Sequence, residues 1–149
     1  MANIKDIISS FGSATKYEKD TNCCSVIALT ASFEIPYDTA HEVAFQQWGR
    51  VDRHGVPSGR IISSFNSGSF LGRCIEKIQT MREYWAPGGS RMRKMKVKSF
   101  AQLYNKGTYY IIIRSHALVV KDGVIIDNRR DAANRNVVKA WKVSSHQVN

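Results

Sequence analysis

The stretch TYYIIIRSHALVVKDGVIID, residues 108–127, decides the fold of this 149-residue chain. Two runs rich in Tyr, Ile, Leu and Val cover 108–114 and 116–121, and a shorter third run covers 124–127. β-Branched and aromatic residues favour strands, and Asp-Gly between two apolar runs strongly favours a two-residue hairpin turn. We therefore predict three antiparallel strands here, with a last strand over 137–143.

The turn at 122–123 also predicts which side chains share a face of the sheet. A two-residue turn pairs Lys121 with Val124, so His116 and Asp127 project from the same face and are diagonally related. That diagonal spans about 7–8 Å between backbones, which side chains can bridge. A turn longer by one residue reverses the parity and brings Asn128 to this face instead of Asp127.

Helices are expected before this sheet. A short helix is predicted over 4–11, a second after Thr21 or Asn22, either of which can cap it, and a third from Pro36 to Gly49. Residues 50–69 are rich in Gly, Ser and Pro and predict a long surface loop that could cover a cleft.

Apolar spacing predicts a further helix over 70–84, with Cys74 in the core, and a short helix capped by Ser99 follows. Helices followed by an antiparallel sheet indicate one α+β domain over residues 1–149.

The formal net charge of +10 is unevenly distributed. Residues 1–75 hold 7 basic and 7 acidic side chains, whereas residues 76–149 hold 15 and 5. Such asymmetry suggests a polyanionic partner, either nucleic acid or an acidic protein, although a solvated basic surface explains it equally well. The candidate polyanion-binding residues lie in one run, namely Arg91, Arg93, Lys94, Lys96 and Lys98.

The composition argues against several classes of protein. No apolar run is long enough to span a bilayer, and the N-terminus does not read as a secretory signal. Three cysteines cannot make a disulfide framework, which fits a reducing cytoplasm. The cysteines and histidines lack zinc-ligand spacing, so neither a metal nor another cofactor is expected.

Cys23 and Cys24 lie at the predicted start of the second helix. The free amides and partial positive charge of a helix N-terminus stabilise a thiolate and can hold an oxyanion. A buried structural cysteine and a surface His–Asp pair are common alternatives. The ordered combination of this thiol with His116 and Asp127 nevertheless matches a nucleophile, a base and a group that orients the base.

Several segments resemble one family. Residues 22–29 (NCCSVIAL) resemble an Asn-Asp-Cys-x-Val-x-Ala-Leu opening, and residues 36–41 (PYDTAH) resemble the Pro-Tyr-x-x-Ala-His segment that follows it. Residues 107–110 (GTYY), 115–117 (SHA) and 122–127 (DGVIID) resemble a Gly-x-Tyr…Gly-His-x…Asp-Gly-x-x-x-Asp close. Together these segments are similar to small papain-like cysteine peptidase domains found mainly in bacteriophages.

The resemblance implies that Cys24 is the nucleophile, His116 the general base and Asp127 the orienting residue. It implies a papain-like fold and a phage-encoded thiol acyl hydrolase that acts on a protein or peptide in a bacterial cytoplasm. Cys23 stands where the family has Asp, and Ser115 where it has Gly. No Gln occurs in residues 1–45, so Asn22 is the nearest candidate for an oxyanion-binding amide.

Two other histidines and a second function complete the predictions. His41 is expected in a packed or capped surface position, and His54 in a solvated loop. Papain-like scaffolds also host deamidases, transferases and inactive binders. The alternative function is therefore a non-catalytic phage protein that binds a host protein or nucleic acid through its basic second half.

Overall fold

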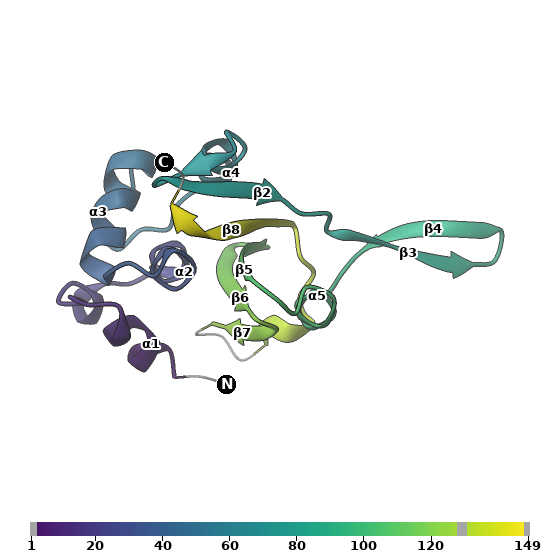
Figure 1. Ribbon diagram of the computed structural model, residues 1–149, viewed down its shortest axis with the longest axis horizontal. Helices are drawn as coiled ribbons and strands as arrows, with labels where there is room; N and C mark the ends of the chain where they lie inside the picture. The colour runs from purple at the N-terminus through teal and green to yellow at the C-terminus, as the bar shows by residue number, and fades with distance from the viewer. Residues whose placement is uncertain (1–2, 128–130, 148–149) are drawn as a thin grey trace.

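The computed structural model describes residues 3–127 and 131–147, which form a mixed α+β structure around an antiparallel sheet. Figure 1 shows the helices α1, α2 and α3 on one side of this sheet and α5 on the other. The strand order is β1-β2-β8-β5-β6-β7, and the bounds are Ser69–Phe70, Arg73–Lys77, Lys139–Gln147, Thr108–Ile113, His116–Lys121 and Val124–Ile126. The predicted α+β class with an antiparallel sheet is confirmed.

The helices are short. They are α1 (Ile4–Ser10), α2 (Cys24–Phe33), α3 (Tyr37–Trp48), α4 (Ser58–Phe65) and α5 (Val97–Leu103), with 3₁₀ turns at Tyr17–Lys19 and Ala132–Asn134. Helix α3 ends as predicted at Gly49, which adopts a left-handed conformation with φ of 64°. Because that conformation strains residues with a Cβ, glycine is well suited to the position.

The central strands separate two apolar layers, because successive side chains alternate between the faces. Tyr110 and Ile112 of β5 pack with α2, α3 and α4, whereas Tyr109 and Ile111 pack with α5. Phe65 is the hub of the first layer, and its ring lies about 5–6 Å from five other aromatic rings. Both faces of β5 and β6 are thus buried, which explains their nearly continuous apolar sequence.

The predicted hairpin is confirmed in detail. Lys121 pairs with Val124 and Val119 with Ile126, so the turn holds only Asp122 and Gly123. The last strand begins at Lys139 and extends to Gln147, beyond the predicted end at 143. Asn128, the alternative to Asp127, lies outside the described residues.

The prediction of one structureless loop over 50–69 is wrong. Pro57 precedes α4, and Ile61 and Phe65 of that helix are buried one turn apart. The sequence prediction missed this helical spacing because Gly and Ser residues, which are typical of loops, surround the two apolar residues. The loop proper covers residues 50–57.

The prediction of a helix over 70–84 is also wrong. Leu71 and Gly72, with φ of 50° and 74°, turn the chain between β1 and β2, and β2 pairs with β8. The helical spacing was coincidental, since Ile75 is buried but Leu71 is 37% exposed. Cys74, expected in the core, is exposed on β2.

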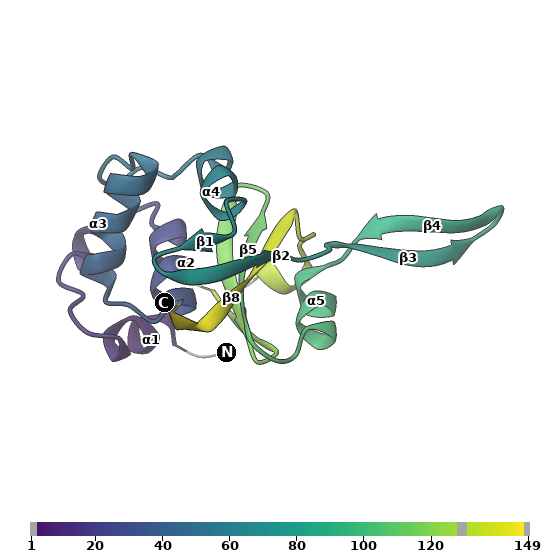
Figure 2. The ribbon, with the colours of Figure 1, turned by 45° about the horizontal axis from the view of Figure 1, so that its top comes forward.

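The basic run also has more structure than expected. Its first part forms β4 (Gly89–Lys94), which pairs with β3 (Met81–Ala86), and α5 begins at Val97 after Lys96, not at a Ser99 cap. The β3–β4 hairpin, here called the arm, projects away from the body of the molecule (Figures 1 and 2). Trp85 on the arm is 83% exposed.

Candidate active site

Helix α2 places Cys24 at its first position. Cys23 is the N-cap and makes no side-chain capping bond, so the capping predicted for Thr21 or Asn22 is wrong. All of α2 after Cys24 is buried, and the Tyr110 hydroxyl donates a hydrogen bond to the Ser25 carbonyl at 3.2 Å. The core therefore fixes the position of the Cys24 backbone, whose N–H lacks an intrahelical partner.

The sheet contributes His116 and Asp127. His116 begins β6 after a turn in which Ser115 has a φ of 59°, and Asp127 directly follows β7. His116 Nε2 lies 2.6 Å from Asp127 Oδ1, and the two side chains are only 5% and 2% exposed. Since a carboxylate accepts, Nε2–H donates to Asp127 and Nδ1 is the nitrogen left for Cys24.

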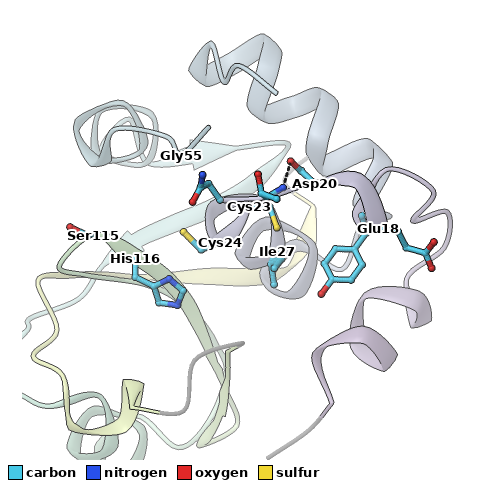
Figure 3. Close-up of a pocket in the computed structure, with 11 residues that line it drawn as sticks. Glu18, Asp20, Cys23, Cys24, Ile27, Gly55, Ser115 and His116 are labelled. Carbon is cyan, nitrogen blue, oxygen red and sulfur yellow. Dashed lines mark hydrogen bonds between the residues drawn. The ribbon is translucent and has the colours of Figure 1, made fainter. Parts of the chain in front are cut away.

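The Cys24 side chain lies beside His116 in the pocket (Figure 3). Burial raises the pKa of Cys24, but hydrogen bonds from His116, Ala117 N–H and Ser25 N–H, with the His116 charge, lower it overall. Burial lowers the pKa of His116, but hydrogen bonds and charges of Asp127 and Cys24 raise it to about 9. Both effects favour a thiolate–imidazolium pair near neutral pH.

Cys23 lies in a different environment, and its sulfur points away from His116 (Figure 3). Burial raises the pKa of Cys23, and the charge of Asp20 adds to this rise, although a hydrogen bond with Tyr37 opposes it. Cys23 is therefore held as a neutral thiol, whereas Cys24 is activated. Of the adjacent cysteines, Cys24 is the one whose surroundings suit a nucleophile.

Asn22 lies on the wall of the site, in a left-handed conformation with φ of 51°. Its side-chain Nδ2 donates to the Arg53 carbonyl at 3.0 Å. One N–H of the amide thus ties the chain before α2 to the 50–57 loop. The backbone amide of Cys24 is a second candidate donor for an oxyanion at this position.

Two pockets meet at Cys24. The first, of about 650 Å³, includes Glu18, Asp20 and Asn22 in its lining, and the second, of about 330 Å³, includes Val56, Ile61 and Ile112. Both are lined by Cys24, Gly55, Ser115 and His116, so the thiol is reached from a polar and an apolar side. Ser25 also lines the apolar pocket, and its hydroxyl oxygen is buried and has no hydrogen-bond partner among the described residues.

A buried ion pair braces the polar pocket, and sequence reasoning missed it. Arg50 Nη2 donates to Asp20 Oδ1 at 2.8 Å and to the Thr21 carbonyl at 3.0 Å, and Tyr37 also donates to Asp20. Arg50 Nε donates to the His54 carbonyl at 2.9 Å, so the same side chain holds the 50–57 loop beside Cys24. No local sequence motif predicts an ion pair between two residues that lie 30 positions apart.

His41, His54 and the five cations of the basic run do not line the two pockets that meet at Cys24. His41 Nε2 is 3.1 Å from Asp52 Oδ1, and His54 is exposed. Arg91 and Arg93 lie on the arm and Lys98 on α5, whereas Lys94 and Lys96 line a pocket beside the site.

No protein-family model, curated protein or solved structure matches this chain in the comparisons made. Within residues 3–127 and 131–147, no group of three or more His, Cys, Asp or Glu side chains is placed to hold a metal ion. In the same ranges, no helix has both the length and the apolar character needed to cross a membrane.

Proposed function

We propose that this chain is a cysteine peptidase or related thiol acyl hydrolase with a papain-like arrangement of Cys24, His116 and Asp127. The observation that carries the proposal is the linear order of three groups, in which Asp127 holds His116 at 2.6 Å and His116 faces Cys24. A base that is oriented by a third group and faces a nucleophile is the arrangement acyl transfer requires.

In the proposed reaction, the Cys24 thiolate attacks the carbonyl carbon of an amide and forms a C–S bond. The amide N–H groups at the start of α2 stabilise the oxyanion that develops. His116 then gives its Nδ1 proton to the leaving amine as the C–N bond breaks. Water, deprotonated by His116, releases the acid from the acyl-enzyme and regenerates the thiol.

The two pockets support a substrate that extends on both sides of the thiol. The apolar pocket suits a side chain or chain segment with apolar character. The bacteriophage resemblance supports the proposal that the enzyme acts in the cytoplasm of an infected bacterium. Deamidation and acyl transfer to another acceptor would use the same first step.

A thiol-directed probe tests the proposal. Iodoacetamide should alkylate Cys24 faster than Cys23 or the exposed Cys74 at pH 6, where only an activated thiol is ionised. Cys24→Ala should abolish this fast labelling and any hydrolysis of a casein substrate, while Cys23→Ala and Cys74→Ala retain both. Equal labelling of Cys24 and Cys74 at pH 6, or hydrolysis by Cys24→Ala, would overturn the assignment.

A second candidate function is favoured by the arm. Its register places Arg82 directly opposite Arg93 and Tyr84 opposite Arg91, so three arginines share one face. Like charges directly opposite each other destabilise a hairpin unless an anion neutralises them. The Arg93 guanidinium also lies 4.7 Å from the centre of the Tyr84 ring. These features suit the phosphates of a nucleic acid.

Salt dependence tests this second candidate. A short DNA duplex or single strand should bind with an affinity that falls steeply as salt rises, and Arg82→Gln with Arg93→Gln should reduce the slope. Trp85→Ala separates base stacking from phosphate contacts. Binding that does not depend on the arm arginines, or binding only of acidic proteins, would reject nucleic acid as the partner.

A further inference from the structure

A basic pocket of about 640 Å³ opens beside the cysteine site, where β5 ends. Four cationic side chains line it, together with two amides, namely Lys94, Lys96, Arg114, Arg135, Asn134 and Asn136. Its lining residues within the described ranges include no Asp or Glu. Asp131 lies 3.4 Å from Arg135 as an ion-pair partner, and both side chains are about half exposed. The pocket therefore carries a concentrated positive charge.

The fold brings these cations together from three separate segments. Residues 95–97 pair with residues 135–137, through a bridge between Lys96 and Asn136 and a 2.9 Å bond from Val97 N–H to the Arg135 carbonyl. Val138 N–H in turn donates to the Ile112 carbonyl of β5 at 2.8 Å. Backbone pairing thus fixes the backbone positions of the residues whose cationic side chains line the basic pocket, although the side chains themselves are exposed.

The basic pocket is continuous with the cysteine site. It shares Ser58, Ile112, Ile113 and Ser115 with the apolar pocket that Cys24 and His116 line. Arg114 and Ser115 form the turn that immediately precedes His116. The three pockets therefore form one continuous path. It begins at Glu18 and Asp20 in the polar pocket, passes the thiol and the apolar pocket, and ends at the four cations of the basic pocket.

We propose that the basic pocket binds the carboxylate of an acidic residue in the peptide substrate and so selects acidic peptides. This inference rests on the proposed thiol hydrolase function. The positive charge attracts a carboxylate, and the apolar pocket between the cations and Cys24 accommodates the intervening peptide. A carboxylate held there fixes the direction in which the peptide crosses the thiol, because the opposite end of the site carries the carboxylate of Glu18, whereas Asp20 is neutralised by Arg50.

Two affinity labels that differ by one charge test the proposal. Iodoacetyl-Gly-Gly-Glu-amide and iodoacetyl-Gly-Gly-Gln-amide carry the same electrophile, and three extended residues reach about 10 Å from it. Intact-mass spectrometry gives the rate of Cys24 labelling by each. At low ionic strength the Glu label should react about fivefold faster or more, and the preference should decline with salt.

Variants of single cationic residues test whether the preference for the Glu label arises from the basic pocket. Lys96→Gln and Arg135→Gln should each reduce the Glu-to-Gln rate ratio about two- to fivefold. Lys98→Gln is the matched control, because Lys98 belongs to the same basic run but does not line the pocket. A wild-type ratio near one, or a ratio that Lys98→Gln lowers as much as Lys96→Gln does, would overturn the proposal.

Two further measurements separate this inference from the proposed function. Iodoacetamide has no peptide and no charge, so its rate reports only on the Cys24 thiol. If that thiol is unreactive, the hydrolase proposal fails, and the pocket is tested by NMR titration of Cys24→Ser with acetyl-Gly-Gly-Glu-Gly-amide and its Gln counterpart. A preference for Glu that Lys96→Gln reduces supports the pocket, and equal affinities refute it. If oligothymidylate displaces the acetyl peptides in the same titration, and the pocket shows no preference for Glu over Gln, the pocket is assigned to nucleic acid instead.

Discussion

Replacing Asp127 with Asn tests how the site activates its thiol. The change keeps the shape of the side chain and removes the charge that His116 faces at 2.6 Å. The rise of the His116 pKa from 6.5 to about 9 corresponds to about 3 kcal/mol in favour of the imidazolium, at about 1.4 kcal/mol for each pH unit. An opposite charge at this separation accounts for about 1 to 3 pH units of such a change.

We therefore expect the His116 pKa in Asp127→Asn to fall to about 7 or below, because burial still opposes the charged ring. NMR titration of the His116 ring nitrogens measures this directly. At pH 8 a ring with a pKa of about 7 has lost most of its positive charge, whereas the wild-type ring keeps it, so iodoacetamide should alkylate Cys24 about tenfold more slowly in the variant at that pH. Asp52→Asn is the control, since Asp52 is an exposed carboxylate near His41.

The sign of the effect on stability follows from the same shift. Folding raises the His116 pKa, so its contribution to the free energy of unfolding is fully present below pH 6.5 and is lost as pH rises through about 9. The stability difference between wild type and Asp127→Asn should therefore shrink over that window. A His116 pKa near 6.5 in the wild type, or one unchanged by Asp127→Asn, would refute the reasoning.

Three further predictions concern the scaffold. Phe65→Ala should lower the free energy of unfolding by about 3–5 kcal/mol in chemical denaturation, because Phe65 is 1% exposed at the hub of the aromatic layer; a loss below about 1 kcal/mol would contradict this. Asp38→Ala should cost about 1–2 kcal/mol at pH 7, since this carboxylate accepts hydrogen bonds from Ser13, Thr15 and Lys16. Those bonds lower the Asp38 pKa from 3.8 to about 2, although burial opposes them, so the cost should vanish as pH falls through that range, and a constant cost would exclude this cause. Trp85→Ala should change thermal stability by less than about 0.5 kcal/mol, and a larger loss would mean that the exposed ring packs on the body.

The sequence predicted the elements whose signals are local. The hairpin of β6 and β7 follows from Asp122 and Gly123, and its register brings His116 to Asp127 without any knowledge of the rest of the fold. The end of α3 follows from Gly49 in the same way. In each case the residues that determine the conformation lie within a few positions of one another.

The features that the sequence did not reveal depend on contacts between distant segments. The segment that forms β2 was predicted as a helix because its partner strand, β8, lies about 70 residues further along the chain. The residues around Cys74 contain no local signal for that pairing. The same holds for Arg50, whose partner Asp20 lies 30 residues upstream. The basic run was visible as composition, but only the bridge between Lys96 and Asn136 places part of it beside the thiol.

The base of the arm has a consequence for how this protein can change. The chain leaves the body at Thr80 and returns at Met95, and Met95 N–H donates to the Thr80 carbonyl at 3.0 Å. Entry and exit are therefore adjacent, and the pairing of β2 with β8 does not pass through residues 82–93. A two-residue turn can replace those residues with little strain on the body. The arm is thus an exchangeable module, free to lengthen, shorten or acquire new contacts while the arrangement of residues around Cys24 stays the same.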